Sequence, residues 1–183
     1  PNAGMAHGTN ENSWVARPFH LDESLHFTNW VTDSALKFLK RRDPTVPFFL
    51  KVSYHQPHHP CTPPQVYWDR YIDDPELPMP VVGEWAKSSD EPVLGTAPTS
   101  WKCRLPEKQM RQFRAGYFGC INHIDDQIGR LLMDLPQNTV VIFTSDHGDM
   151  LGDHEWNRKT RGLESSARIP LLFKFPQSMG IMR

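Results

Sequence analysis

The sequence has few cysteines, and their spacing excludes two classes of protein. Its three cysteines, among 183 residues, are Cys61, Cys103 and Cys120, and they form no CxxC pair. This spacing predicts neither a zinc site nor a disulfide framework. Three thiols cannot all pair with one another, and free thiols slightly favour a cytoplasmic compartment over a periplasmic or secreted one.

The chain also lacks a long apolar run and an excess of charge. No stretch reaches the roughly 20 apolar residues that cross a membrane as a helix, and the net charge is −1. These absences argue against a membrane partner and against a nucleic-acid partner. The length suits one ordinary domain. The chain begins at Pro1 rather than at a methionine, so the lack of a signal peptide carries no weight. Nothing in the composition indicates an oligomeric state.

Apolar periodicity divides the chain into five predicted elements. Residues 21–42 and 106–135 repeat apolar side chains at helical spacing. Residues 47–54, 139–144 and 169–175 are short apolar runs and are predicted to be strands. The run 139–144 is typical of a strand that is buried on both faces in a parallel sheet. The polar, proline-rich segment 71–105 is predicted to be a long surface loop.

Chemically useful side chains follow the strand 139–144. Asp146 and His147 come directly after it, and His154 and Lys159 lie in the next loop. The carboxyl end of a buried strand is where ligands bind in open α/β sheets. A carboxylate, an imidazole and an ammonium group there could serve a metal ion and an anionic substrate. The tripeptide Asp-His-Gly taken alone is better explained by a polar turn.

A second cluster of histidines follows the predicted strand 47–54. His55, His58 and His59 lie within five residues and are separated by prolines. Histidine clusters can bind metals, but the prolines stiffen this segment, so the rings need not converge. For the cluster taken alone, a rigid polar loop is therefore favoured over a metal site.

The longest pattern in the chain resembles the C-terminal signature of the sulfatase family. The stretch TSDHGDMLGDHEWNRK is followed, four residues later, by ESSARIPLLF. In that family a strand ends in Ser-Asp-His/Asn-Gly, then come Gly-Asp-His/Glu, a lysine and Glu-x-Ser-x-Arg-Val/Ile-Pro-Leu. The resemblance implies an α/β fold of the alkaline-phosphatase-like kind, a mainly parallel sheet flanked by helices. It covers only the later part of the catalytic domain, so residues 1–183 are expected to be an incomplete domain.

The resemblance also assigns roles to individual residues. Asp146 and His147 would contribute to a divalent metal site, usually calcium in this family. Because calcium prefers oxygen ligands, His147 leaves manganese and zinc as alternatives. Lys159 would hold an oxygen of the sulfate group, and His58 would protonate or hydrogen-bond the leaving oxygen. His154 would lie on the substrate side of the site.

The nucleophile of the family is not found in this chain. Sulfatases carry Cys/Ser-x-Pro-Ser-Arg, whose first residue is oxidised to formylglycine. Cys61 and Pro63 fit the start of that motif, but Pro64 and Gln65 do not fit its end. Cys61 is therefore rejected, and the formylglycine is expected in a missing N-terminal part. The chain is then either a fragment of a longer enzyme or a truncated, inactive copy.

The function implied by the resemblance is hydrolysis of a small-molecule or carbohydrate sulfate ester. One alternative is a phosphonate monoester or phosphodiester hydrolase of the same superfamily. The other is a non-catalytic domain that keeps the fold and binds a partner or an anion. The sequence does not name the alcohol that carries the sulfate.

Overall fold

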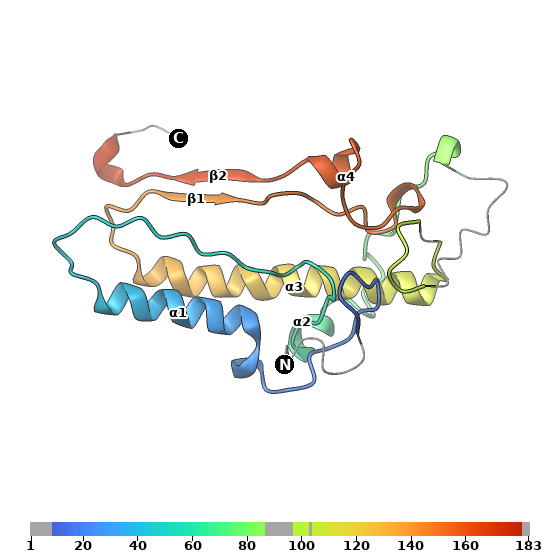
Figure 1. Cartoon of the computed structure of the whole chain (residues 1–183), viewed down its shortest axis with the longest axis horizontal. Coiled ribbons are helices and arrows are strands. Elements are labelled where there is room, and N and C mark those ends of the chain that lie inside the picture. Colours follow the sequence, from blue (N-terminus) through green and yellow to red (C-terminus); the bar gives the residue numbers. More distant parts are fainter. Residues whose placement is uncertain (1–8, 87–96, 103, 181–183) are drawn as a thin grey trace.

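Two long helices lie side by side beneath a two-stranded ribbon in the computed structural model (Figure 1). The structure describes residues 9–86, 97–102 and 104–180. Its elements, in chain order, are η2 (Glu23–Leu25), α1 (Phe27–Arg41), α2 (Gln65–Trp68), η3 (Glu84–Ala86), α3 (Glu107–Asp134), β1 (Val141–Thr144), η4 (Asp153–Glu155), α4 (Glu164–Ala167), β2 (Leu171–Lys174) and η5 (Gln177–Met179). No helix among these residues is long and apolar enough to cross a membrane.

Helix α3 confirms the helix predicted over 106–135. Pro106 precedes its first residue, where a proline costs no helical hydrogen bond. The helix ends before Leu135, which is extended because Pro136 follows it. Its buried face carries Phe113, Cys120 and Leu131, so the predicted apolar stripe does face the interior in part.

Helix α1 is shorter than predicted, and only part of its apolar repeat is buried. It begins at Phe27, where the ring of His26 accepts a hydrogen bond from the backbone N–H of Thr28. Two bulky side chains of the apolar repeat in the predicted helix, Trp30 and Phe38, are exposed. The face toward α3 instead carries small and polar side chains, Thr28, Asn29, Thr32 and Ala35. Asn29 and Thr32 have hydrogen-bond partners there, whereas the buried Thr28 hydroxyl has none. These short side chains let the helices approach closely, and the bulky side chains lie outside.

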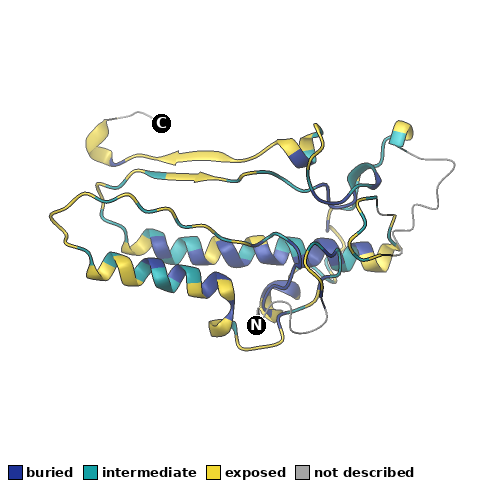
Figure 2. Ribbon diagram, viewed as in Figure 1, coloured by how far each residue is buried: buried dark blue, intermediate teal, exposed yellow. Residues whose placement is uncertain are grey.

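The strands β1 and β2 form an antiparallel pair, with Val141 opposite Lys174 and Thr144 opposite Leu171. Both strands are largely exposed (Figure 2), so β1 is not buried on both faces as predicted. A mainly parallel sheet is therefore not confirmed within the described residues. An apolar run indicates that the side chains of a segment are buried in the complete fold, but it does not specify the direction of the neighbouring strand.

Two further predictions for strands and loops have mixed outcomes. Residues 47–54 are extended and lie between the helices and β1 in Figure 1, but they form no ladder with another described strand. The segment 71–105 is mostly turns and irregular backbone where it is described, which confirms a loop there. Residues 87–96 and 103 of that segment lie outside the described residues.

The hydrophobic core lies toward one end of the molecule, around the first half of α3. Its buried members are Ala16, Cys61, Trp68, Met110, Phe113, Cys120 and Leu151. Burying one such large side chain stabilises the fold by about 2 kcal/mol. Cys61 and Cys120 are free thiols, as predicted, whereas Cys103 lies outside the described residues. This core fixes the loops that carry the candidate site.

Candidate active site

The structure brings two of the predicted site residues into direct contact. The Nζ atom of Lys159 lies 2.8 Å from the Nε2 atom of His58. The other ring nitrogen of His58, Nδ1, lies 2.9 Å from the carbonyl oxygen of His59. A carbonyl oxygen only accepts, so Nδ1 carries the hydrogen, and Nε2 accepts from the Lys159 ammonium group. His58 is therefore held in one tautomer with its Nε2 lone pair toward the lysine.

The surroundings of His58 favour its neutral form. Burial lowers the pKa of His58, and the positive charges of Lys159, His55 and His59 lower it further, against the hydrogen bond to the His59 carbonyl. His58 and Lys159 are each partly exposed, so a small anion can reach both side chains. The arrangement offers an anion a cationic donor and an imidazole at the same point.

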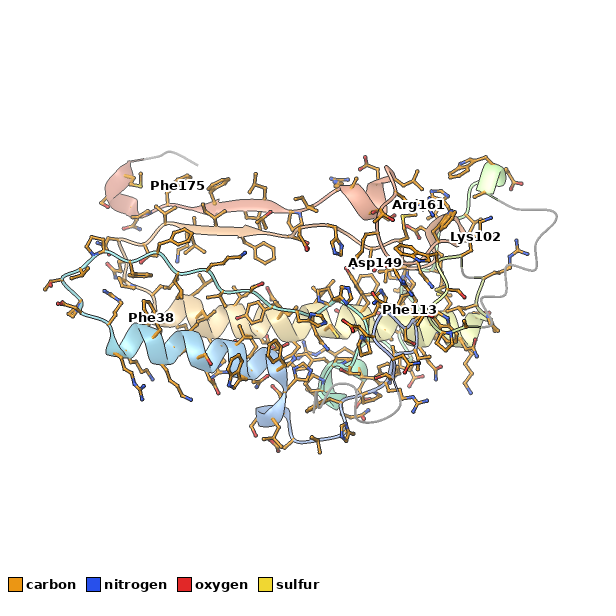
Figure 3. All side chains as sticks on the ribbon, viewed as in Figure 1. Phe38, Lys102, Phe113, Asp149, Arg161 and Phe175 are labelled. Carbon is orange, nitrogen blue, oxygen red and sulfur yellow. The ribbon has the colours of Figure 1, made fainter. Side chains whose placement is uncertain are left out.

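Asp149 connects the two loops that carry His58 and Lys159. Its Oδ2 atom lies 2.8 Å from Nε2 of His59, and its Oδ1 atom accepts from the backbone N–H groups of Leu151 and Arg158 at 2.9 and 3.1 Å. Burial opposes ionisation of Asp149, but these hydrogen bonds and the charge of His59 outweigh it and lower its pKa. Asp149 lies where this loop faces α3, near Phe113 in the view of Figure 3.

His59 is the positively charged partner of Asp149. Burial alone would lower the pKa of His59, but the nearby Cys61 sulfur and the Asp149 carboxylate act in the opposite direction and prevail. Burial also raises the pKa of Cys61 well above its usual value, so near neutral pH its sulfur stays a neutral thiol. The Asp149 carboxylate is then the charge that keeps His59 protonated. The sequence indicated His59 only as a member of the histidine cluster and did not indicate Asp149, because neither belongs to a spacing pattern with a known role.

Three contacting side chains resemble a nucleophile with its base and the acid that orients the base, namely Cys61, His59 and Asp149. The sulfur of Cys61 lies 3.8 Å from Nδ1 of His59. However, Cys61 has no exposed surface, and its thiol donates to the Pro57 carbonyl oxygen at 3.5 Å. A protonated, buried thiol cannot attack a substrate. The geometry thus agrees with the rejection of Cys61 as nucleophile.

Asp146 and His147 lie just beyond β1 and present two metal-binding atoms. Nδ1 of His147 donates to the Gly148 carbonyl oxygen at 2.7 Å, which leaves Nε2 as the acceptor nitrogen. That Nε2 atom lies 3.7 Å from Oδ2 of Asp146, whose side chain is 88% exposed. A carboxylate oxygen and an imidazole nitrogen side by side suit two positions around a divalent metal. Across the described residues, no three His, Cys, Asp or Glu side chains converge into a complete metal site.

Gly148 allows this segment to approach α4 closely. Its backbone N–H donates to the Ser166 carbonyl oxygen at 2.8 Å. A Cβ atom at Gly148 would overlap the carbonyl oxygen of Ser165. Only glycine therefore fits between the metal-binding pair and α4.

His154 contacts a different part of the chain from His58 and Lys159. Its Nδ1 atom accepts from the backbone N–H of Gly83 at 3.1 Å, and its ring lies 4.8 Å from that of Trp85. Its own backbone N–H donates to Val81. His154 thus anchors the segment 81–86, and its place in substrate binding stays a prediction.

Comparison with known proteins places this geometry in a family. The sequence matches the Sulfatase family over residues 5–179. It is 45% identical over 177 residues to an arylsulfatase of Clostridium perfringens, a match that covers 94% of this chain and 37% of that protein. It is 32% identical over 166 residues to human iduronate 2-sulfatase, covering 79% of this chain and 30% of that protein. The chain thus spans about a third of the length of these relatives.

Solved structures share the fold. A phosphonate monoester hydrolase of Agrobacterium radiobacter superposes with a TM-score of 0.74 at 23% identity, over 96% of this chain and 38% of that one. A protein solved with its substrate D-glucosamine-2-N,6-O-disulfate gives a TM-score of 0.65 at 22% identity, over 82% of this chain and 43% of that one. These likenesses establish the fold alone. The family match over 5–179 and the identity of 45% to an arylsulfatase show that this chain belongs to the sulfatase family.

Proposed function

We propose that this chain is the part of a sulfuric ester hydrolase that holds the sulfate group and assists departure of its alcohol. The observation that carries the proposal is the 2.8 Å contact between Lys159 and His58. A cation and a neutral imidazole that converge on one point are suited to an anionic ester, whose charged oxygens need the cation and whose leaving oxygen needs a proton.

Lys159 would act on the charge of the sulfate group. Its ammonium group is a compact point charge with three donors. When a sulfate oxygen enters the site, one of these donors can turn from His58 to that oxygen. The lysine then stabilises the charge that grows on the oxygens as the ester bond breaks, which is often a large contribution to catalysis.

His58 would act on the leaving alcohol. In the structure its Nε2 atom carries no proton, since it accepts from Lys159. A bound sulfate anion favours the protonated ring, because a nearby negative charge raises the pKa of an imidazole. The proton on Nε2 can then pass to the bridging oxygen as the alcohol departs. The Nδ1–H bond to the His59 carbonyl keeps Nε2 on the substrate side throughout.

Asp146 and His147 would hold part of a divalent metal site. The bound metal would act as a Lewis acid: it would polarise the sulfate oxygens and lower the pKa of the nucleophilic hydroxyl. Calcium is the usual metal of the family, whereas the imidazole of His147 suits manganese or zinc better.

The nucleophile and the other metal ligands would come from a complementary part of the catalytic domain. The family's nucleophile is a formylglycine, and none of the 183 residues fits its motif. Exposed apolar side chains on β1, on β2 and at Phe49 support this interpretation, because such surfaces are normally covered. In the complete domain we expect further strands, mainly parallel, to cover them.

The substrate class is a small-molecule or carbohydrate sulfate ester. Relatives of this chain include an arylsulfatase, an iduronate 2-sulfatase and a choline-sulfatase. Their names refer to aromatic, sugar and choline sulfates. They therefore support hydrolysis of a sulfate ester without indicating one particular alcohol. Neither a membrane nor a nucleic acid is needed as a partner for this chemistry.

The second candidate function is hydrolysis of phosphonate monoesters or phosphodiesters. A relative that is 32% identical over 182 residues is described as a multifunctional alkaline phosphatase superfamily protein. A cation and an acid would serve a phosphoryl ester as well as a sulfate ester. Sulfate hydrolysis remains the first candidate because the relative of 45% identity is an arylsulfatase.

The test is turnover by the complete protein on matched 4-nitrophenyl esters. We expect 4-nitrophenyl sulfate to be hydrolysed faster than 4-nitrophenyl phenylphosphonate and bis(4-nitrophenyl) phosphate. Faster cleavage of either phosphorus ester would favour the second candidate. Binding of inorganic sulfate without any turnover would favour a non-catalytic domain. Residues 1–183 expressed alone are expected to release no sulfate, and turnover by them would reinstate Cys61 as a nucleophile.

A further inference from the structure

His59 and Asp149 form a buried ion pair between the two loops of the candidate site. They are 90 residues apart in sequence, yet Nε2 of His59 lies 2.8 Å from Oδ2 of Asp149. Only 2% of the His59 side chain and 6% of the Asp149 side chain are exposed. We propose that this pair is a positioning device that holds His58 and Lys159 at their working distance. The inference rests on the proposed function of that site.

The Asp149 end of the pair fixes the loop that carries Lys159. Its Oδ1 atom accepts from the backbone N–H of Arg158, the residue before Lys159. The Met150 N–H donates to the Arg158 carbonyl oxygen at 2.8 Å, which closes the loop a second time. The Arg158 side chain donates to the carbonyl oxygens of Asn12 and Thr99. The backbone that enters Lys159 is therefore restrained from several sides, and one carboxylate joins it to the histidine loop.

The His59 end of the pair fixes the ring of His58. The His59 carbonyl oxygen accepts from Nδ1 of His58 at 2.9 Å and so selects its tautomer. The His59 ring packs against Phe113 of α3, with 5.0 Å between the ring centroids. Because the ring of His59 is anchored to both Asp149 and α3, its carbonyl oxygen keeps a constant direction. Second partners of this kind commonly set the tautomer of a functional histidine.

The location of the pair favours positioning over a general contribution to stability. A buried ion pair is weak evidence for stability, because removing two charges from water costs about as much as their attraction returns. This pair joins the residue after His58 to the loop that leads into Lys159. A misplacement of about 1 Å in a catalytic group can cost 100-fold in rate. Loss of the pair should therefore reduce catalysis in molecules that remain folded.

The experiment compares three side chains at position 59 in the complete protein. His59→Phe keeps a ring against Phe113 but removes the donor to Asp149. His59→Gln removes the ring but keeps an N–H donor that can reach the carboxylate. Asp125→Asn, at an exposed position on α3, is the control for handling and expression. If His59→Phe does not fold, His59→Met removes the donor with a flexible side chain that adapts to the core.

Two readouts are measured below the unfolding temperature of each variant. The first is kcat and KM for 4-nitrophenyl sulfate. We expect a loss of at least about tenfold in kcat for His59→Phe, a loss below about threefold for His59→Gln, and no change for Asp125→Asn. The second is the ¹⁵N NMR spectrum of the His58 ring, which distinguishes its tautomers. We expect the Nδ1–H tautomer in the wild type and in His59→Gln, and a mixture in His59→Phe.

The two readouts separate failure of this inference from failure of the proposed function. If folded His59→Phe keeps the wild-type kcat and the wild-type His58 spectrum, the pair does not position the site. Equal losses for Phe and Gln would also overturn the inference, since a donor to Asp149 would then not restore the geometry. If the wild type hydrolyses no sulfate ester, the proposed function fails, and the His58 spectrum alone still decides whether His59 sets its tautomer.

Discussion

Lys159 donates from its Nζ atom to the Nε2 atom of His58 across 2.8 Å, although 101 residues separate the two in sequence. The contact is suited to exchange, because an entering anion can take the lysine donor and leave His58 able to accept a proton. The direction of the His58 ring and its neutral form thus depend in part on a side chain that lies far away in sequence.

The first prediction concerns Lys159. Lys159→Ala should lower kcat/KM for 4-nitrophenyl sulfate by at least about 100-fold in the complete protein, the usual result of losing one donor to a developing charge. Lys108→Ala removes the same group from an exposed position on α3 and should leave the rate unchanged. Steady-state kinetics measure both, and wild-type kinetics for Lys159→Ala would refute the assigned role.

The second prediction uses the leaving group to test the acid role of His58. Esters of weakly acidic alcohols need a proton on departure, whereas 4-nitrophenol leaves readily as an anion. His58→Ala should therefore slow an alkyl sulfate more than 4-nitrophenyl sulfate, by at least about tenfold in the ratio of their rates. Equal slowing of both esters would show that His58 does not donate the proton.

The third prediction concerns the close approach at Gly148. Gly148→Ala places a methyl group against the Ser165 carbonyl oxygen, and such overpacking typically costs about 1–3 kcal/mol. At Gly129 on α3 an added methyl group meets nothing within 4 Å, so Gly129→Ala should stabilise the helix by about 0.5–1 kcal/mol. Urea unfolding of the two variants should show opposite shifts of the midpoint. A neutral Gly148→Ala would mean that α4 can move away.

The sequence was informative where spacing along the chain decides the outcome. The apolar repeat located α3 almost to the residue, because local periodicity and a preceding proline specify such a helix. The resemblance selected His58 and Lys159, and the fold brings them into contact. Motif spacing could do this because each residue follows a segment whose conformation is largely local.

The sequence did not predict structural features that depend on contacts between residues distant in the chain. The buried face of α1 includes polar residues such as Thr32. The Thr32 hydroxyl donates to the Thr28 carbonyl oxygen and also lies within hydrogen-bond distance of the Tyr54 hydroxyl. No apolar stripe could reveal that choice. The antiparallel partner of β1 and the His59–Asp149 pair are likewise set by tertiary contacts.

The fourth prediction is a pH dependence of stability that arises at His123. This ring has no exposed surface, and its Nε2 atom donates to Oδ1 of Asn29 at 2.5 Å. Its Nδ1 atom has no hydrogen-bond partner, so protonation there would create an unpaired buried charge. Burial, and then the charge of His26, lower the pKa of His123 to about 3. The Glu23 carboxylate, 3.6 Å away, favours the charged ring, but it is partly exposed and therefore screened.

The direction of the effect follows from the folded pKa being lower than the unfolded one. Between about pH 6.5 and pH 3 the unfolded chain binds a proton at His123 that the folded chain refuses, so stability falls as the pH falls. Between pH 7 and pH 5 this single group should remove about 2 kcal/mol of folding free energy. His123→Gln keeps a donor for Asn29 but cannot be protonated, so its stability should decline less over that interval. Urea unfolding of both proteins at the two pH values measures the difference, and parallel losses would show that His123 accepts a proton in the folded state.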